Sequence, residues 1–207
     1  MRNLVTAVTL CLLTTAIAQA QDAGLYEDVA SPDASFVRVI VPPNVVAMVQ
    51  TTSFSSLETG LSPYVVVDKP GEVQISAGVD ETKATVEAGK FYTYVVGTDG
   101  KGNLLTDTIT RSPGQADVAF YNLSDVAAVD LYVPAAKAVA IAAVAAGAGN
   151  AVALKAPLTI DFELRDGDKV LATIPAVDLK RREGVTIILR GTGGTYTAFA
   201  AANALAR

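Results

Sequence analysis

Two stretches of the sequence predict the same succession of strands, and this repetition constrains the fold more than any other feature. Ser35 to Val41 is rich in β-branched and aromatic residues, which predicts a strand, and Val45 to Thr51 is interpreted as its hairpin partner. The pattern returns 81 residues later, where Ala116 to Leu123 and Ala128 to Val133 predict two strands separated by a short turn. The chain is therefore predicted to consist of two similar units in tandem.

Much of the remaining sequence alternates apolar and polar residues at the period of half-buried strands. Short strands at this spacing, with almost no helical periodicity, predict an all-β chain of two tandem β-sandwich domains, immunoglobulin-like in type. The predicted cores contain Val37, Val39, Val73 and Ile75 in one domain, and Ile160, Phe162, Leu164 and Ile187 in the other.

The domain boundary is predicted at Arg111 to Gln115, a short linker that contains Pro113 and Gly114. The first domain then covers residues 21–112 and the second covers residues 113–207. Ala135 to Ala153 is ambiguous, because its many alanines favour a helix. We interpret it as strand and loop, since Val139, Ile141 and Val152 suit a sheet and the neighbouring segments are all strands.

Residues 1–20 have the form of a secretory signal peptide. An apolar run from Leu4 to Ile17 is followed by Ala18-Gln19-Ala20, which predicts cleavage after Ala20 and a periplasmic location. A membrane anchor is disfavoured, because a span needs about 18 apolar residues and this run is shorter and interrupted by threonines. Cys11, the single cysteine of the chain, lies inside this leader.

Composition excludes several classes of function. The chain has no histidine and no tryptophan, so imidazole chemistry is excluded, and the exported part has no cysteine for thiolate chemistry or disulfides. Residues 21–112 carry twelve Asp or Glu against six Lys or Arg, a net charge of −6, while residues 113–207 carry nine of each. This balance argues against a nucleic-acid partner and predicts weak or no direct polysaccharide binding, since an acidic polymer would be repelled.

The motifs that resemble catalytic or metal sites are each better explained by structure. Ser62 follows Gly60-Leu61 as in a nucleophile elbow, but the closing glycine is missing. Asp161 and Glu163 lie on one strand face and are interpreted as a solvated outer face. Asp99 to Asn103 begins like a calcium loop, but Lys101 stands where a carboxylate belongs. We therefore predict no enzyme activity, no catalytic residues, no cofactor and no metal.

Three side chains are candidates for partner binding. Arg38 projects from its strand opposite Val37 and Val39, so we expect it on an outer face or at a sheet edge, where it would contact a partner or form a local ion pair. Tyr92 and Tyr94 project from one strand face, where they would stack on a ligand or pack together as an aromatic pair.

One basic cluster, Lys180-Arg181-Arg182, precedes a predicted strand. It is compatible with contact to an anion, although a solvated turn is the preferred interpretation.

Several segments resemble one known family. They are Leu25-Tyr26, Pro32, Ser35-Phe36-Val37-Arg38-Val39, Ala119-Phe120-Tyr121-Asn122-Leu123-Ser124-Asp125 and Phe162-Glu163-Leu164-Arg165-Asp166-Gly167-Asp168-Lys169. These segments resemble AlgF, a family of periplasmic proteins of alginate O-acetylation. The resemblance implies a two-domain β-sandwich protein that acts as a non-catalytic adaptor in acetylation of alginate or a related exopolysaccharide, a process of biofilm-forming cells. Its implied partners are the periplasmic acetyltransferase proteins of the same system and the membrane-bound O-acyltransferase.

The alternative interpretation is a generic secreted immunoglobulin-like binding module unrelated to acetylation. Ser31-Pro32-Asp33 and Ala128 to Val133 also resemble an uncharacterised family of exported all-β domains. Nothing in the sequence identifies the polysaccharide, the partner-binding surface or the oligomeric state.

Overall fold

The computed structural model describes residues 30–97 and 100–206. The predicted signal peptide, with Cys11, lies outside the described residues, as does Asp99. Within the described part of the chain, no helix is long and apolar enough to cross a membrane.

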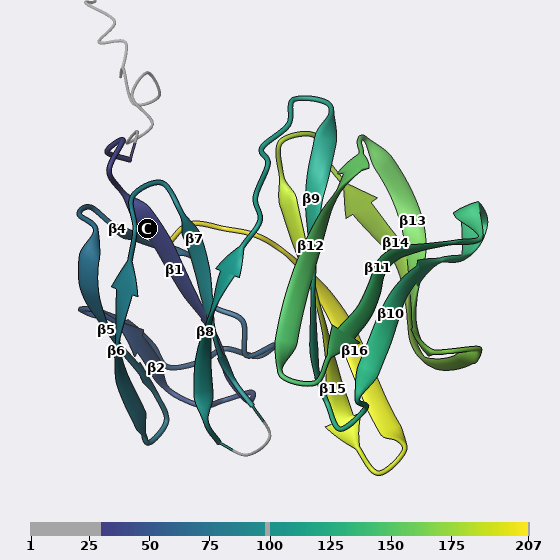
Figure 1. Ribbon diagram of the computed structural model, residues 1–207, viewed down its shortest axis with the longest axis horizontal. Helices are drawn as coiled ribbons and strands as arrows, with labels where there is room; N and C mark the ends of the chain where they lie inside the picture. The colour runs from purple at the N-terminus through teal and green to yellow at the C-terminus, as the bar shows by residue number, and fades with distance from the viewer. Residues whose placement is uncertain (1–29, 98–99, 207) are drawn as a thin grey trace, which may run out of the picture.

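The regular structure of the described residues is all strand except for one 3-10 turn (Figure 1). The N-terminal half contains β1 (Ser35–Ile40), β2 (Ala47–Val49), β3 (Thr52–Phe54), β4 (Val65–Val67), β5 (Gly71–Ala77), β6 (Asp80–Val86), β7 (Phe91–Val96) and β8 (Gly102–Asp107). The C-terminal half contains β9 (Gln115–Ser124), β10 (Ala128–Val133), η1 (Pro134–Ala136), β11 (Ala138–Ala145), β12 (Ala148–Lys155), β13 (Leu158–Asp166), β14 (Lys169–Leu179), β15 (Gly184–Thr192) and β16 (Thr195–Ala202).

The two halves have the same sheet topology. The N-terminal half forms sheets with the strand orders β4-β1-β7-β8 and β3-β2-β5-β6, and the C-terminal half forms β12-β9-β15-β16 and β11-β10-β13-β14. Adding eight to each strand number of the first half gives the orders of the second half. In each half the first strand also pairs in parallel with the seventh, β1 with β7 and β9 with β15. The predicted fold class, an all-β chain of two tandem β-sandwiches, is confirmed.

The predicted pairing of the first two strands is wrong. β1 pairs with β4 and β7, whereas β2, which lies within Val45 to Thr51, pairs with β3 and β5 in the other sheet. Crossing between sheets buries Ala47 and Val49 of β2 in the same cluster as Val37 and Val39 of β1. The chain thus closes the sandwich, which a local hairpin would not do.

The Ala-rich segment forms two strands, as the strand interpretation predicted, and they belong to different sheets: β11 pairs with β10 and β12 pairs with β9. β11 and β12 are joined at Gly147, whose positive φ of 74° suits a tight turn. Ile141 and Val144 of β11 are buried in the core of the C-terminal half. Because these contacts form only in the sheet, tertiary packing overrides the helix propensity of alanine.

Each half has its own apolar core. Val37, Val39, Val73 and Ile75 are buried in one, and Phe162, Leu164 and Ile187 in the other, with Ile160 partly buried against it. These positions agree with the alternation in the sequence, because one face of each strand must leave water in a sandwich.

A third apolar cluster joins the two halves. It contains Ile40 of β1 and Val95 of β7 together with Tyr121 of β9 and Ile188 of β15. We call β4-β1-β7-β8 and β12-β9-β15-β16 the inner sheets, because they supply this cluster and face each other (Figure 1). The central strands of the inner sheets are therefore buried on both faces, and every residue of β1 is buried.

Cutting the linker should leave the two halves together. We expect that a sequence-specific protease site inserted between Pro113 and Gly114, once cleaved, gives fragments that still elute as one species in gel filtration. The reason is that the third cluster lies between the inner sheets and does not depend on the linker. Fragments that separate in neutral buffer without denaturant would contradict this expectation.

Candidate functional site

Arg38 lies between the two halves and is the centre of the candidate site. Side chains alternate along β1, so Val37 and Val39 enter the N-terminal core while Phe36, Arg38 and Ile40 face the other way. In this protein that other face meets the C-terminal half. Arg38 is consequently only 1% exposed.

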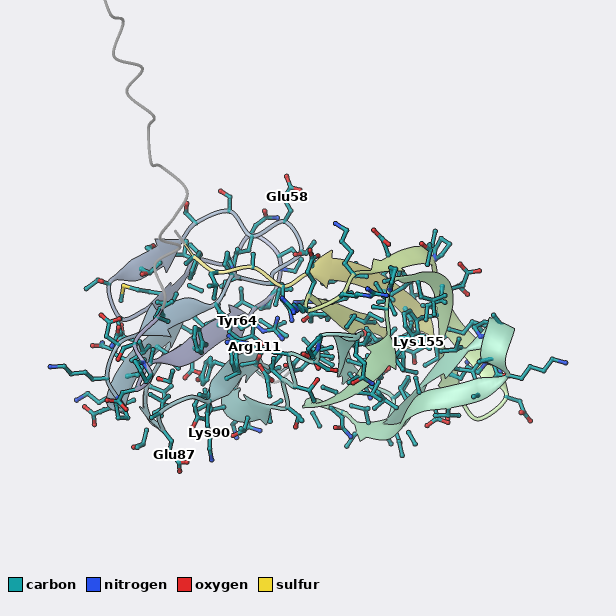
Figure 2. The ribbon with its side chains drawn as sticks, turned by 90° about the horizontal axis from the view of Figure 1, so that it is seen from above. Glu58, Tyr64, Glu87, Lys90, Arg111 and Lys155 are labelled. Atoms are coloured by element: carbon teal, nitrogen blue, oxygen red, sulfur yellow. The ribbon has the colours of Figure 1, made fainter. Side chains whose placement is uncertain are left out.

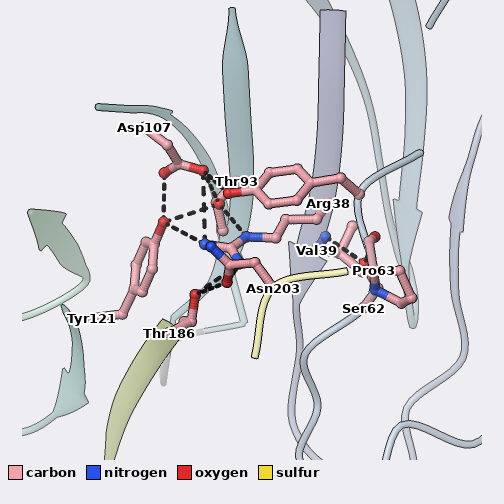
Figure 3. A network of polar contacts seen from close by, with 10 residues as sticks. Arg38, Val39, Ser62, Pro63, Thr93, Asp107, Tyr121, Thr186 and Asn203 are labelled. Carbon is pink, nitrogen blue, oxygen red and sulfur yellow. Dashed lines mark hydrogen bonds and ion pairs between the residues drawn. The ribbon is translucent and has the colours of Figure 1, made fainter. Parts of the chain in front are cut away.

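The Arg38 guanidinium is hydrogen-bonded to both halves (Figure 3). Nε donates to Thr93 Oγ1 at 2.8 Å in the N-terminal half. Nη1 donates to Thr186 Oγ1 at 2.8 Å and to Asn203 Oδ1 at 2.9 Å, both from the C-terminal half. Nη2 donates to Tyr121 OH at 3.2 Å. A buried charge is tolerable when its donors are satisfied in this way.

Asp107 supplies the negative charge of the site. Its Oδ2 lies 3.8 Å from Arg38 Nη2, and the Asp107 side chain is 4% exposed. The carboxylate also accepts hydrogen bonds from Tyr64, Thr93 and Tyr121. The Arg38 guanidinium further lies 4.3 Å above the ring of Tyr64, within the range of a cation–π contact.

Burial and charge both act on the ionisable groups of the site. Burial alone lowers the pKa of the Arg38 guanidinium, but its interactions with Tyr121, Tyr64 and Asp107 outweigh burial, so that this pKa is raised. Burial is the main cause that raises the pKa of Tyr64 and of Tyr121 well above the ordinary value, and the neighbouring Arg38 only partly offsets it. Both phenols therefore remain protonated donors.

The partners of Arg38 occupy equivalent positions in the two halves. Thr93 of β7 pairs with Arg38 of β1, and Thr186 of β15 pairs with Ala119 of β9, so the two threonines correspond. Thr93 also pairs with Leu105, and Thr186 with Ala201. Asp107 and Asn203 each follow two residues later and therefore also correspond. One arginine is thus held by a Thr–Asp pair from one half and by the matching Thr–Asn pair from the other.

Beyond β16 the chain returns to the N-terminal half. Tyr64 N donates to Ala204 O and Ala206 N donates to Tyr64 O, both at 2.8 Å, so residues 203–206 add a short parallel bridge beside β4. Figure 1 shows this last segment crossing from β16 to the side of the molecule that holds β1 and β4. The C-terminal end is therefore part of the junction between the two halves.

A second arginine also crosses the interface. Arg190 Nη2, from β15, donates to the carbonyl oxygen of Val41 at 2.7 Å. Burial lowers the pKa of Arg190 to about 10, so this side chain is still a cation at neutral pH.

The serines that resemble nucleophiles have structural partners. Ser62 Oγ accepts from Val39 N and donates to the carbonyl oxygen of Pro63, and Ser124 Oγ donates to Asn122 Oδ1. Neither hydroxyl is hydrogen-bonded to a side chain that acts as a general base. In the described ranges, no group of three or more acidic, histidine or cysteine residues is placed to hold a metal ion.

The expected exposure of Arg38 is wrong. The face opposite Val37 and Val39 is covered by the C-terminal half, so Arg38 is buried rather than on an outer face or edge. The sequence does indicate that this face is buried, because the apolar residues Phe36 and Ile40 lie on the same face as Arg38. A strand that is apolar on both faces is typical of a sheet covered on both sides.

Tyr92 and Tyr94 are packed in the N-terminal core, 5% and 3% exposed. The Tyr92 hydroxyl accepts from Glu87 N, and the Tyr94 hydroxyl donates to Asp80. Both rings are thus packed by the core, but among the described residues neither forms the expected aromatic pair. The role in partner binding assigned to Arg38, Tyr92 and Tyr94 stays a prediction.

Comparison with known proteins identifies the family. The family model described as "Alginate O-acetyl transferase AlgF" matches residues 7–186. The chain belongs to the AlgF family. An alginate biosynthesis protein AlgF from Pseudomonas fluorescens is 29% identical over 180 residues, which cover 86% of this chain and 82% of the relative.

Solved AlgF domains from P. aeruginosa are also similar to this chain. The C-terminal domain is 23% identical and covers 44% of this chain and 99% of its own length, with a TM-score of 0.39. The N-terminal domain is 22% identical and covers 38% and 99%, with a TM-score of 0.32. The AlgF family is one of alginate biosynthesis, as the relative's name states, and the family model's name associates it with O-acetylation.

Removing one partner of the buried pair should destabilise the whole protein. We expect Arg38→Met to lower the free energy of unfolding by about 3–5 kcal/mol, because it leaves the Asp107 carboxylate buried and unpaired. The double variant Arg38→Met, Asp107→Asn should recover part of this loss, since the uncompensated charge is gone. Urea denaturation measures both.

The exposed pair of Lys83 with Glu72 provides the control, since both side chains are more than half exposed. Lys83→Gln should leave the unfolding midpoint close to that of the parent protein. If the unfolding midpoint of Arg38→Met were as close to that of the parent protein as the midpoint of Lys83→Gln is, the assigned role of Arg38 would be contradicted.

Tyr64 and Tyr121 should make stability fall at alkaline pH. The raised pKa of each phenol means that the folded protein keeps both protons where the unfolded chain, with an ordinary pKa of about 10, releases them. The unfolded state then binds fewer protons, so the free energy of unfolding is unaffected below about pH 9 and decreases above about pH 10. Urea denaturation from about pH 9 to above about pH 10, followed together with tyrosinate absorbance, tests this. The prediction would be contradicted if all tyrosines of the folded protein ionised near the ordinary pKa of about 10 and the free energy of unfolding did not change.

Proposed function

We propose that this AlgF-family protein is a non-catalytic periplasmic adaptor for O-acetylation of alginate or a related exopolysaccharide, and that it bridges the proteins that transfer the acetyl group. The observation that supports this most is the junction at Arg38. Hydrogen bonds from one guanidinium to both halves hold the two sandwiches in a fixed arrangement. An adaptor benefits from such rigidity, because its two partner surfaces then keep a constant spacing and little ordering entropy is lost on binding.

The chemistry of the chain supports a non-catalytic role. Acyl transfer through a serine needs a base within hydrogen-bond reach, and this base is usually an imidazole. The chain has no histidine, and the hydroxyls of Ser62 and Ser124 are engaged with backbone or amide groups. Acetyl transfer is therefore assigned to the partners of this protein.

Free edges of the two outer sheets, β3-β2-β5-β6 and β11-β10-β13-β14, suit protein contact. The sheet β3-β2-β5-β6 ends at β6, a strand of seven residues whose Glu81, Lys83 and Thr85 are exposed. An edge strand can bind an extended segment of a partner through main-chain hydrogen bonds, while its side chains provide selectivity. We propose the β6 edge as one docking surface for an acetyltransferase of the same system.

The test uses the mature protein, residues 21–207, as bait for the periplasmic acetyltransferase proteins of the same system. We expect direct capture of at least one of them, and no release of acetate from a chromogenic acetyl ester by the bait alone. Charge reversal at Glu81 and Lys83 should weaken capture, whereas reversal at Glu87 and Lys90, an exposed pair outside β6, should not. Figure 2 labels this control pair at the surface of the N-terminal half.

Two results would overturn the proposal. Acetate release by the bait that disappears in Ser62→Ala or Ser124→Ala would show that the protein is itself an enzyme. Failure to capture any acetyltransferase of the system, together with submicromolar binding of an acidic oligosaccharide, would favour a polysaccharide-binding module instead.

A further inference from the structure

The turn between β14 and β15 contains three consecutive cations, Lys180, Arg181 and Arg182, and all three are exposed. Hydrogen bonds tie this turn to two other segments of the chain. Arg182 N donates to the carbonyl oxygen of Gln115 at 2.9 Å. Arg181 Nε donates to the carbonyl oxygen of Ala156 at 3.0 Å. The start of β9, the end of β12 and the β14–β15 turn therefore meet at one end of the C-terminal half, at the top of Figure 1.

Lys155 adds a fourth cation to this end. It is the exposed last residue of β12 and pairs with Gln115, the first residue of β9. Figure 2, which views the molecule from this end, labels Lys155 on the C-terminal half. Leu158 begins β13 and pairs with Leu179, the residue just before the turn, and it is 46% exposed. We call these four cations, together with the exposed Leu158, the basic end.

Carboxylates neutralise only part of the charge of the basic end. Glu183 lies 3.9 Å from the Lys180 ammonium, and both side chains are more than half exposed. Asp178 precedes a buried residue of β14, so it projects from the outer face of that sheet. Asp117 is buried and accepts hydrogen bonds from residues 110 and 111. The other three cations form no ion pair within residues 30–97 and 100–206, so the basic end keeps a net positive charge.

The opposite end of the C-terminal half is acidic. Asp125 follows β9, and Asp166 and Asp168 lie at the turn between β13 and β14, together with Lys169. The half carries nine acidic and nine basic residues, so its zero net charge hides a separation of charge along the strands. The eleven residues of β14 join the two ends and span roughly 35 Å, which is several Debye lengths at physiological ionic strength. The basic end therefore acts on a partner through its own local charge.

We propose that the basic end binds the anionic phospholipid headgroups of a membrane surface. This inference does not depend on the proposed function, because it rests on the charges and exposure of this end alone. Lysines and arginines close to an anionic leaflet are attracted to it, while charges beyond about one Debye length, such as the acidic opposite end, are largely screened. Leu158 adds an apolar side chain that can enter the interface, and peripheral binding strengthens when charge and apolar burial act together.

A layer of headgroups fits the basic end better than a folded acidic protein does. The cations come from two separate segments of the chain and surround an exposed leucine. Lipid headgroups rearrange to meet cations at scattered positions, whereas a folded partner must hold its carboxylates at fixed, complementary positions. The interface below the headgroups also provides an apolar environment for the leucine.

The test is cosedimentation of the mature protein with vesicles of equal parts phosphatidylglycerol and phosphatidylcholine. We expect binding to these vesicles, none to pure phosphatidylcholine, and a bound fraction that falls as sodium chloride is raised from about 0.05 M to about 0.5 M. Lys155→Gln and Arg182→Gln should each weaken binding about fivefold, because each removes a cation near the surface. Glu183→Gln should strengthen binding by a similar factor, because it removes an anion. Leu158→Ser should weaken binding without changing its dependence on salt.

Lys169→Gln is the matched control, because Lys169 is the exposed first residue of β14 and lies at the opposite end of that strand. It removes the same charge and should leave vesicle binding unchanged, and thermal unfolding checks that each variant is folded. Equal losses in Lys169→Gln and Lys155→Gln would overturn the proposal, since binding would then follow total charge. Absence of vesicle binding would also overturn it, and binding of polyglutamate without vesicle binding would favour an acidic protein partner instead. Capture of the acetyltransferases is measured without vesicles, so the proposed function is judged separately.

Discussion

The structure depends on one buried ion pair. Arg38 and Asp107 lose nearly all contact with water, which costs several kcal/mol for each ion. That cost is offset only when both halves are in place, because Thr186 and Asn203 of the C-terminal half complete the hydrogen bonds of the guanidinium. The hydrogen bonds of the Arg38 guanidinium are therefore complete only in one relative arrangement of the two sandwiches. Apolar contacts alone would tolerate many relative orientations.

Duplication explains why such a site can be built at all. Two copies of one sandwich place equivalent strands on each side of the junction, so a Thr–Asp pair faces its counterpart, a Thr–Asn pair. The symmetry is broken at the first strand, where Arg38 in one half corresponds to Ala119 in the other. A second arginine at position 119 would bring two like charges together, whereas alanine has no charge. The carboxylate of Asp107 and the amide of Asn203 then contact a single cation, the guanidinium of Arg38.

The junction also links the fold to the proposed function. The linker and residues 203–206 both pass from one half to the other beside Arg38. The outer sheets remain at the far sides of the molecule, where their edges are available to other proteins. A fixed junction with free outer edges is the arrangement that an adaptor requires.

Much of the fold was determined by local pattern in the sequence. Alternation placed Val73, Ile75 and Phe162 in their cores, because a strand in a sandwich buries one face whatever its partners are. The same reasoning failed for Arg38, because alternation tells which residues share a face but not what covers that face. Thr93, Asp107, Thr186 and Asn203 carry no sequence signal as a group, since they converge from strands far apart in the chain. The sequence thus determined the strands, the cores and the duplication, which arise from local backbone preference and burial. Only the tertiary structure decided that two sandwiches stack through their inner sheets around a buried charge, because that choice depends on the shape and hydrogen-bonding of two assembled surfaces.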